Sequence, residues 1–309
     1  MLVQWLARLN WFDEVCRQVA PVFKKMHHFK IMTQSYSKKR VVVTLTDQGY
    51  YSKAKRTIMD IRSRGEWREE IVLITIGFDA HINFLDYYDV TPLRMEHIDT
   101  SGLLKAYETH PLLPTSDHRE IKKLTQWDKF YVFHEYFKKW DRVIFLDAGL
   151  RVFHPIEHLA RIPCDGLILA PDDAPPYDLT KRFGGIIETN RNLQVVERLF
   201  EEYSPDILEK RYFLNCIWMY DTSLLSKVSL QDLIDAMNKY PICRCNEMTI
   251  MNLLFTFKHR LWRPFPEYCT DHRLRLFGWT ERDRDYGLHT SWRDFCFLKY
   301  PSTITMDCE

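Results

Sequence analysis

Polar side chains that close apolar runs are the residues of this chain best placed to do chemistry. Three such runs carry them: Thr44, Thr46 and Asp47 at the end of the first, Asp147 at the end of the second, and Asp172 and Asp173 at the end of the third. Short β-branched or aliphatic runs predict strands buried in a parallel sheet, and ligands bind such sheets at the carboxyl ends of the strands. The pattern therefore predicts a polar site along one edge of a sheet.

Asp147 is the sharpest candidate, because it follows the four apolar residues "VIFL" directly. A carboxylate in that place is suited to Mg²⁺ or Mn²⁺, which take oxygen ligands and share them with phosphates. Such a metal neutralises the charge on a nucleoside diphosphate as it leaves. The alternative for any single acid is that it caps the next turn or helix. The prediction of a site therefore depends on the acids occurring together.

The elements that would position these residues read as one α/β domain. Residues 41–77 read as strand, turn, helix and strand, the repeating unit of a mostly parallel sheet. The other predicted elements are a short strand in 91–99, a short helix within 100–118, a helix over 119–140, strands at 141–147 and 167–173, a strand running into a helix over 211–225, an apolar helix at 245–255 and a short strand at 259–266. The predicted fold is a Rossmann-like, mostly parallel central sheet flanked by helices.

Residues 1–38 read as an amphipathic helical extension of a single domain at 39–309. Apolar residues recur there at helical spacing, and the basic residues outnumber the acidic ones. A basic amphipathic helix can lie on a membrane surface. Packing on the domain, or on a second copy of the chain in a homodimer, is favoured over that peripheral contact.

Composition excludes some function classes. The chain has 43 Lys and Arg against 42 Asp and Glu, a balance that argues against nucleic-acid binding. Its eight cysteines have no metal-ligand spacing, which predicts buried thiols. The first residues do not read as a secretory signal, and no apolar run is long enough to span a membrane. These features predict a cytoplasmic protein.

From about residue 41 to 292 the chain resembles the nucleotide-sugar glycosyltransferases of the glycogenin-like type, family 8, whose fold is called GT-A. The resemblance is carried by segments that match in order: "VVVTLTDQGYYSKA", "KLTQWDKFYVFHEYFKKWDRVIFLDAG", "LILAPDD", "YFLNCIWMYDTSLL", "NEMTIMNLLFTFKHRLWRPFP" and "GLHTSW". No single segment is specific to the family, but several matches in the same order are moderately specific to it. It implies retaining transfer of a hexose or amino-hexose from a UDP-sugar to an acceptor hydroxyl on a glycan or protein, with Mn²⁺ or Mg²⁺ bound.

The resemblance also implies roles for individual residues. Carried over by position, these are Thr44, Thr46 and Tyr51 for the nucleotide base; Lys129 facing the donor; Asp147 for the metal; His289 for the metal and diphosphate; and Asn215 and Glu247 for the donor sugar or acceptor. Glu247 or Asp172 would then steady the positive charge on the sugar carbon.

One departure from the family pattern affects the predicted metal site. The second acid of the family's metal motif is Gly149 here, and Arg151 or Arg293 could partly replace the cation, since guanidinium pairs well with phosphate. The alternative hypothesis is therefore a catalytically weak or inactive protein that binds nucleotide sugars or carbohydrate. A nucleotidyltransferase ranks lower, because that chemistry usually uses a Gly-rich phosphate loop and "TDQGYYSK" offers one glycine.

Overall fold

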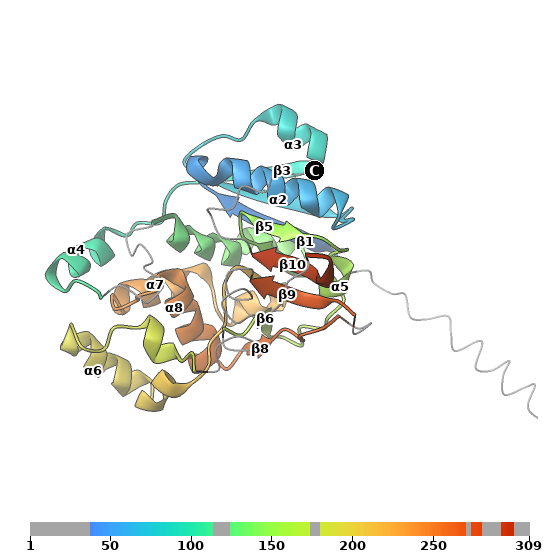
Figure 1. Cartoon of the computed structure of the whole chain (residues 1–309). Coiled ribbons are helices and arrows are strands. Elements are labelled where there is room, and N and C mark those ends of the chain that lie inside the picture. Colours follow the sequence, from blue (N-terminus) through green and yellow to red (C-terminus); the bar gives the residue numbers. More distant parts are fainter. Residues whose placement is uncertain (1–37, 114–123, 174–179, 270–272, 280–291, 300–309) are drawn as a thin grey trace, which may run out of the picture. The chain divides into compact units, whose positions relative to one another are not determined.

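A computed structural model describes residues 38–113, 124–173, 180–269, 273–279 and 292–299. Its centre is a seven-stranded sheet of order β3-β2-β1-β4-β7-β6-β8 (Figure 1). The strands are β1 Arg40–Thr46, β2 Glu70–Ile76, β3 Val90–Met95, β4 Arg142–Leu146, β6 Ile168–Ala170, β7 Ile217–Asp221 and β8 Trp262–Pro264. Among these strands only β7 runs antiparallel to its neighbours, so the predicted mostly parallel sheet is confirmed.

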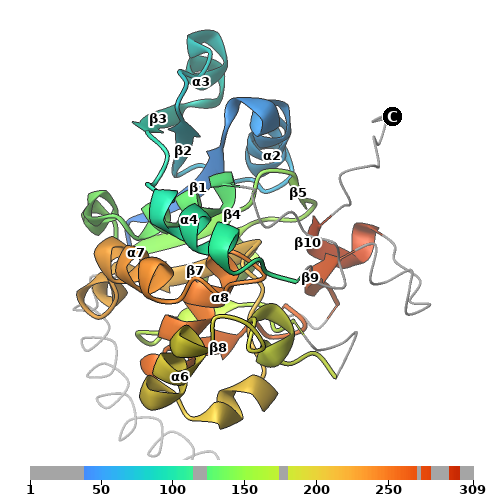
Figure 2. The same ribbon diagram turned by 90° about the vertical axis from the view of Figure 1, so that its left-hand side faces the viewer.

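Helices cover the sheet, which explains why its central strands are apolar on both faces. The longer ones are α2 Tyr51–Ser63, α3 Ile82–Tyr88, α4 Ser101–Thr109, α6 Leu193–Glu202 and α7 Leu230–Lys239. The shorter or tighter ones near the site are the 3₁₀ helix η2 Leu124–Phe133, α8 Glu247–Met251 and the π-helix η7 Asn252–Lys258. Helix α2 packs against β1, while η2, α7 and α8 contact one another (Figure 2).

A second, three-stranded sheet has the order β5-β10-β9, with β5 Leu150–Val152, β9 Arg275–Trp279 and β10 Phe295–Lys299. Strand β5 directly follows the turn after β4. Strand β10 runs antiparallel to β5, with Lys299 opposite Leu150, and Figure 2 shows β9 and β10 to one side of the large sheet. The sequence did not predict this sheet, yet it lies next to the acid that closes β4.

Three predicted elements differ in detail. The predicted helix over 119–140 is, within the described residues, two 3₁₀ helices separated at His134, which is extended (φ −69°, ψ 147°) and caps the second helix, η3 Glu135–Lys139. The predicted strand at 211–225 begins only at Ile217, and the residues after Asp221 form a short 3₁₀ helix. The predicted helix at 245–255 begins at Glu247 and continues as a π-helix to Lys258. The predicted extension at 1–38 lies outside the described residues, apart from its last residue.

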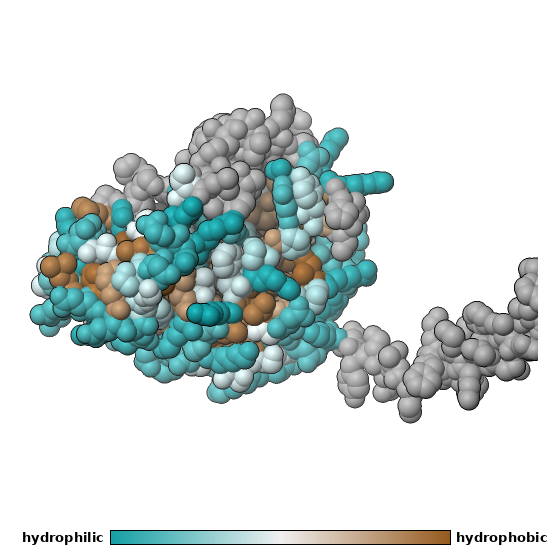
Figure 3. All heavy atoms as spheres, turned by 90° about the horizontal axis from the view of Figure 1, so that it is seen from below, coloured by the Kyte–Doolittle hydropathy of each residue, from teal (hydrophilic) through white to brown (hydrophobic). Residues whose placement is uncertain are grey.

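The described surface is mixed in character. Figure 3 shows apolar residues scattered among hydrophilic ones on the face it presents. The exposed large apolar side chains are Met59, Ile82, Tyr87, Leu113, Leu193 and Tyr268. Within the described part of the chain, every helix is too short or too polar to cross a bilayer.

The cysteines that the structure describes are buried thiols, as predicted: Cys164, Cys216, Cys243, Cys245, Cys269 and Cys296. The sulfur atoms of Cys269 and Cys296 lie 3.2 Å apart. That separation exceeds the length of a disulfide bond, about 2.05 Å.

Candidate active site

A cluster of charged and polar side chains at the carboxyl end of β4 joins segments far apart in the sequence. Lys129 Nζ lies 3.5 Å from Asp147 Oδ1 and 3.0 Å from Glu247 Oε1. Asn215 Nδ2 donates a hydrogen bond to the same Glu247 oxygen at 2.7 Å. Lys129 comes from η2, Asp147 follows β4, Asn215 precedes β7 and Glu247 opens α8. The fold thus brings together four of the predicted site residues.

A second lysine, which the sequence did not point to, completes this cluster. Lys299 at the end of β10 donates to Asp147 Oδ2 at 2.7 Å. It reaches Asp147 because the register of β10 sets Lys299 opposite Leu150, in the strand that follows the Asp147 turn. The one sequence signal is the apolar run "FCFL", which ends on this lysine. Each carboxylate oxygen of Asp147 therefore faces an ammonium group.

These contacts fix the charge states in the cluster. Burial alone would raise the pKa of the Asp147 carboxyl, but Lys129 and Lys299 outweigh it and hold that pKa at about 2. Burial would lower the pKa of Lys129, but Asp147 and Glu247 raise it above its ordinary value. The side chains of Asp147 and Lys299 are 20% and 21% exposed, whereas that of Lys129 is 10% exposed. A ligand entering from solvent therefore meets Asp147 and Lys299 first.

Glu247 is the most enclosed acid of the cluster. Its side chain is 3% exposed, and its Oε2 has no hydrogen-bond partner among the described residues. The preceding residue, Asn246, has φ 47° and donates its amide to Gln126 at 2.6 Å, which fixes the start of α8. A buried carboxylate oxygen without a partner costs free energy, so this atom is a candidate contact for a ligand group.

The turn after β4 explains the glycine that follows the acid. The backbone N–H of Leu150 donates to the Asp147 carbonyl at 3.0 Å, and Gly149, third in this turn, has φ +91°. A turn of this kind requires glycine at that place, because side chains disfavour such a φ. Thr57 Oγ1 accepts the Gly149 N–H at 3.0 Å and holds the turn against α2. The backbone conformation of this turn therefore explains why a glycine stands where the family's metal motif has its second acid.

The segment that carries Asn215 is held by α8 and η7. Asn252 accepts from the Phe213 N–H at 2.9 Å and donates to the Phe213 carbonyl at 3.0 Å. A single amide side chain thereby satisfies both backbone groups of a buried residue, as buried polar groups require. This clamp sets Asn215 beside Glu247.

The predicted base-pocket residues lie on and just after β1. Thr44 and Thr46 are buried, and Thr46 Oγ1 donates to the Asp47 carbonyl at 2.8 Å. Tyr51 is 7% exposed, and its hydroxyl accepts the backbone N–H of His81 at 3.1 Å while its ring stacks on the His81 ring, with centroids 5.7 Å apart. Their contact with a nucleotide base stays a prediction.

The remaining predicted residues lie elsewhere or outside the described chain. Asp172, beyond the end of β6, forms an ion pair with Arg211 at 2.8 Å. His289 lies outside the described residues. Arg151, considered as a replacement for the cation, makes a buried ion pair with Asp60. The other arginine considered, Arg293, is exposed.

The described part of the site does not fit the divalent cation that the resemblance implies. Such an ion takes several oxygen ligands, usually six or more. Asp147 has an ammonium group at both oxygens, and the turn carries glycine at the second motif position. Across the described ranges, no three His, Cys, Asp or Glu side chains form a group that could hold a metal.

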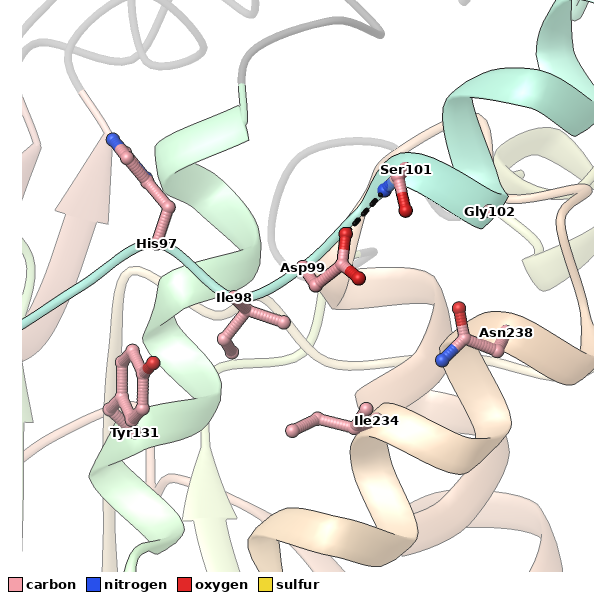
Figure 4. Close-up of a pocket in the computed structure, with 8 residues that line it drawn as sticks. All are labelled: His97, Ile98, Asp99, Ser101, Gly102, Tyr131, Ile234 and Asn238. Carbon is pink, nitrogen blue, oxygen red and sulfur yellow. Dashed lines mark hydrogen bonds between the residues drawn. The ribbon is translucent and has the colours of Figure 1, made fainter.

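A separate pocket of about 490 Å³ lies between η2, the segment after β3, and the helices α4 and α7 (Figure 4). It is lined by His97, Ile98, Asp99, Ser101, Gly102, Tyr131, Ile234 and Asn238. Asp128, the residue before Lys129, holds one wall by accepting the Ile98 N–H at 2.8 Å and bonding to His97 Nδ1 at 2.7 Å. The pocket shares no lining residue with the cluster around Asp147.

No family model and no curated protein matches the sequence. Solved structures do match. The galactosyltransferase LgtC, in complex with donor and acceptor sugar analogues, aligns with a TM-score of 0.53 at 11% identity, over 87% of this chain and 90% of that one. An active-site variant of LgtC aligns with a TM-score of 0.55 at 12% identity, over the same shares. The chain has the GT-A fold.

Other GT-A proteins align over part of their own length. The bifunctional glycosyltransferase WbbM matches with a TM-score of 0.51 at 11% identity, over 88% of this chain and 47% of that one. The glycosyltransferase GlyE of Streptococcus pneumoniae matches with a TM-score of 0.51 at 12% identity, over 86% and 55%. At sequence identities this low, the structural similarity shows a shared fold and nothing about function. The α/β class and GT-A type predicted from the sequence are confirmed.

Proposed function

We propose that this GT-A protein is a glycosyltransferase that moves a hexose or amino-hexose from a nucleoside-diphosphate sugar, with UDP as the nucleotide, to an acceptor hydroxyl. The observation that carries the proposal is the chain of contacts at the strand ends that runs from Asp147 through Lys129 and Glu247 to Asn215. In open α/β sheets this edge is where ligands bind. These four residues come from separate segments of the chain, and the fold brings them to one place.

The reaction breaks the bond between the anomeric carbon and the diphosphate oxygen, whose electron pair stays on the diphosphate. The acceptor hydroxyl oxygen forms a bond to the same carbon, on the face that retains its configuration, and its proton passes to the departing diphosphate oxygen. Glu247 is suited to steady the positive charge on the sugar carbon, because its buried Oε2 has no described partner. Asp172 is the weaker candidate for that role, since Arg211 already neutralises it.

A second candidate function is binding of a sugar nucleotide without transfer. The replacement of the second motif acid by Gly149, and the two lysines on Asp147, favour it. The resemblance implies metal assistance, but the described part of the site does not supply the ligands for it. Turnover separates the two functions, since a binding protein retains the donor unchanged.

The test is UDP release from UDP-glucose, UDP-galactose and UDP-N-acetylglucosamine by the wild type and by Glu247→Gln. The substitution keeps the shape and the bond from Asn215 but removes the negative charge. We expect kcat to fall about 100-fold, the order seen when one stabilising group is lost from a transition state. The melting temperature should change by a few degrees at most.

Glu188→Gln is the matched control. Glu188 is also buried, but its carboxylate accepts the backbone N–H groups of Leu113 and Asn190 instead of joining the cluster. This variant should keep its turnover. Binding of UDP-sugars without release of UDP would favour the second candidate. A folded wild type that neither binds nor turns over any UDP-, GDP- or dTDP-sugar would contradict both candidate functions.

A further inference from the structure

Lysines from three elements surround the turn that follows β4. Lys129 of η2 and Lys299 of β10 each contact one oxygen of Asp147, at 3.5 and 2.7 Å. Lys53 of α2 lies over the other end of the turn, with its Cδ 3.5 Å from the place that a β-carbon on Gly149 would take. Glu247 is the other acid in this set of contacts. Two ammonium groups, those of Lys129 and Lys299, therefore lie where the family pattern has its metal, while the ammonium group of Lys53 lies over the Tyr50 ring.

We propose that Lys299 and Lys129, in place of a divalent cation, bind the diphosphate of the donor. The proposal rests on the proposed function and concerns how the same site holds its substrate. An ammonium group has three N–H donors and no acceptor, so one lysine can bond to a carboxylate and to a phosphate oxygen at the same time. Lysine is a common point-charge partner of phosphate.

The charge change in the reaction suits fixed cations. The diphosphate gains one negative charge when its bond to the sugar breaks, and that charge is stabilised by positive groups already in place. Lys129 is held between Asp147 and Glu247, and Lys299 is held by strand pairing and by Asp147. Neither cation has to be recruited from solution.

A divalent cation at Asp147 would face an electrostatic penalty. It would have to displace one or both ammonium groups from the carboxylate and then sit beside their positive charges, and like charges at such distances repel strongly. The turn offers no second acid, and φ at Gly149 disfavours placing one there. The same features that weaken a metal site favour direct binding of phosphate.

Lys299 is the better lysine to test. Its side chain is 21% exposed, so a ligand can reach it, and its contact within the cluster is with Asp147. Lys129 is 10% exposed and also neutralises the buried Glu247, so its removal would disturb more than phosphate binding. Lys239 is the matched control, a half-exposed lysine that pairs with another carboxylate, Glu202.

The experiment is calorimetric titration of the full chain with UDP and with uridine, in EDTA and in Mn²⁺. We expect the wild type to bind UDP in EDTA within threefold of its affinity in Mn²⁺. Lys299→Met should weaken UDP binding in EDTA at least tenfold, as expected for the loss of one charged hydrogen bond, and leave uridine binding unchanged. Lys299→Arg should restore most of the affinity, and Lys239→Met should match the wild type.

The outcomes separate this proposal from the proposed function. UDP binding that needs Mn²⁺, or Lys299→Met binding UDP in EDTA as the wild type does, would overturn the lysine proposal and leave the glycosyltransferase proposal standing. Absence of binding by UDP, GDP and dTDP in both conditions would overturn both. If Lys299→Met does not fold, the wild-type comparison between EDTA and Mn²⁺ decides the matter.

Discussion

Gly149 links backbone conformation to the chemistry of the site. Its φ of +91° is one that side chains rarely adopt, and its N–H is held by Thr57. We expect Gly149→Ala to lower the free energy of unfolding by about 1–2 kcal/mol, the usual cost of such strain. For a chain of this size that is a drop of a few degrees in melting temperature, measured by thermal unfolding.

Gly185→Ala is the control for this prediction. A β-carbon at Gly185 would meet no atom within 4 Å, and φ there is outside the strained range. This variant should therefore melt within a degree or so of the wild type. Equal melting temperatures for the two variants would contradict the assigned role of the turn.

Sequence and structure agree on some site residues for a physical reason. Asp147 was found from the sequence because a carboxylate directly after a buried run is unusual. Lys299 was missed because lysine after a short apolar run is ordinary, and only the register of β10 gives it a role. Glu247 and Asn215 were found through the resemblance alone. Their contact with each other depends on long-range packing that no local pattern encodes.

At the scale of elements, the best-predicted parts were the central strands. After a charged first residue, strands β1, β2 and β4 are continuous runs of apolar residues and threonine, because helices or other chain segments cover both faces. The small sheet was missed because β5 has three residues and β9, "RLFGW", alternates weakly. Strands this short have no periodicity to read, and tertiary pairing defines them.

Glu202 links α6 to α7 and η7, and its contacts predict a pH-dependent effect on stability. On α6, it accepts bonds from Lys239 and Tyr240 at the end of α7 and pairs with Lys258 of η7. Burial would raise the pKa of Glu202, but these donors outweigh it and lower the pKa from 4.5 to about 2. A carboxyl group whose pKa is lower in the folded than in the unfolded state stabilises the folded state at pH values above its pKa in the unfolded state. That stabilisation is lost as the pH falls to the folded-state pKa.

We therefore expect Glu202→Gln to melt below the wild type at pH 6 and to approach it between pH 4.5 and 2. The measurement is thermal unfolding across that range for both proteins. Glu201→Gln, a change at the exposed neighbouring residue, should follow the wild type throughout. A constant gap between Glu202→Gln and the wild type at every pH would refute the assigned ion pairs.

At the scale of the whole molecule, the domain boundary gives the remaining prediction. Residues Lys39–Glu309 form a compact unit by their own contacts, and β1 begins at Arg40. We expect a chain lacking residues 1–37 to keep its melting temperature within about two degrees and to bind UDP as the full chain does. Light scattering of both chains would test the predicted dimer contact. A truncated chain that aggregates would show that the domain needs its extension.

The pairing of Lys299 with Leu150 makes the site sensitive to changes in chain length. Side chains alternate across a strand, so deleting one of the four residues before Lys299 would turn the ammonium group to the opposite side of β10. Deleting two would restore the original side but would set the lysine opposite Val152 instead of Leu150, about 7 Å along the strand. Shortening this strand by either one or two residues should therefore separate the lysine from Asp147, although the lysine is 152 residues further along the chain.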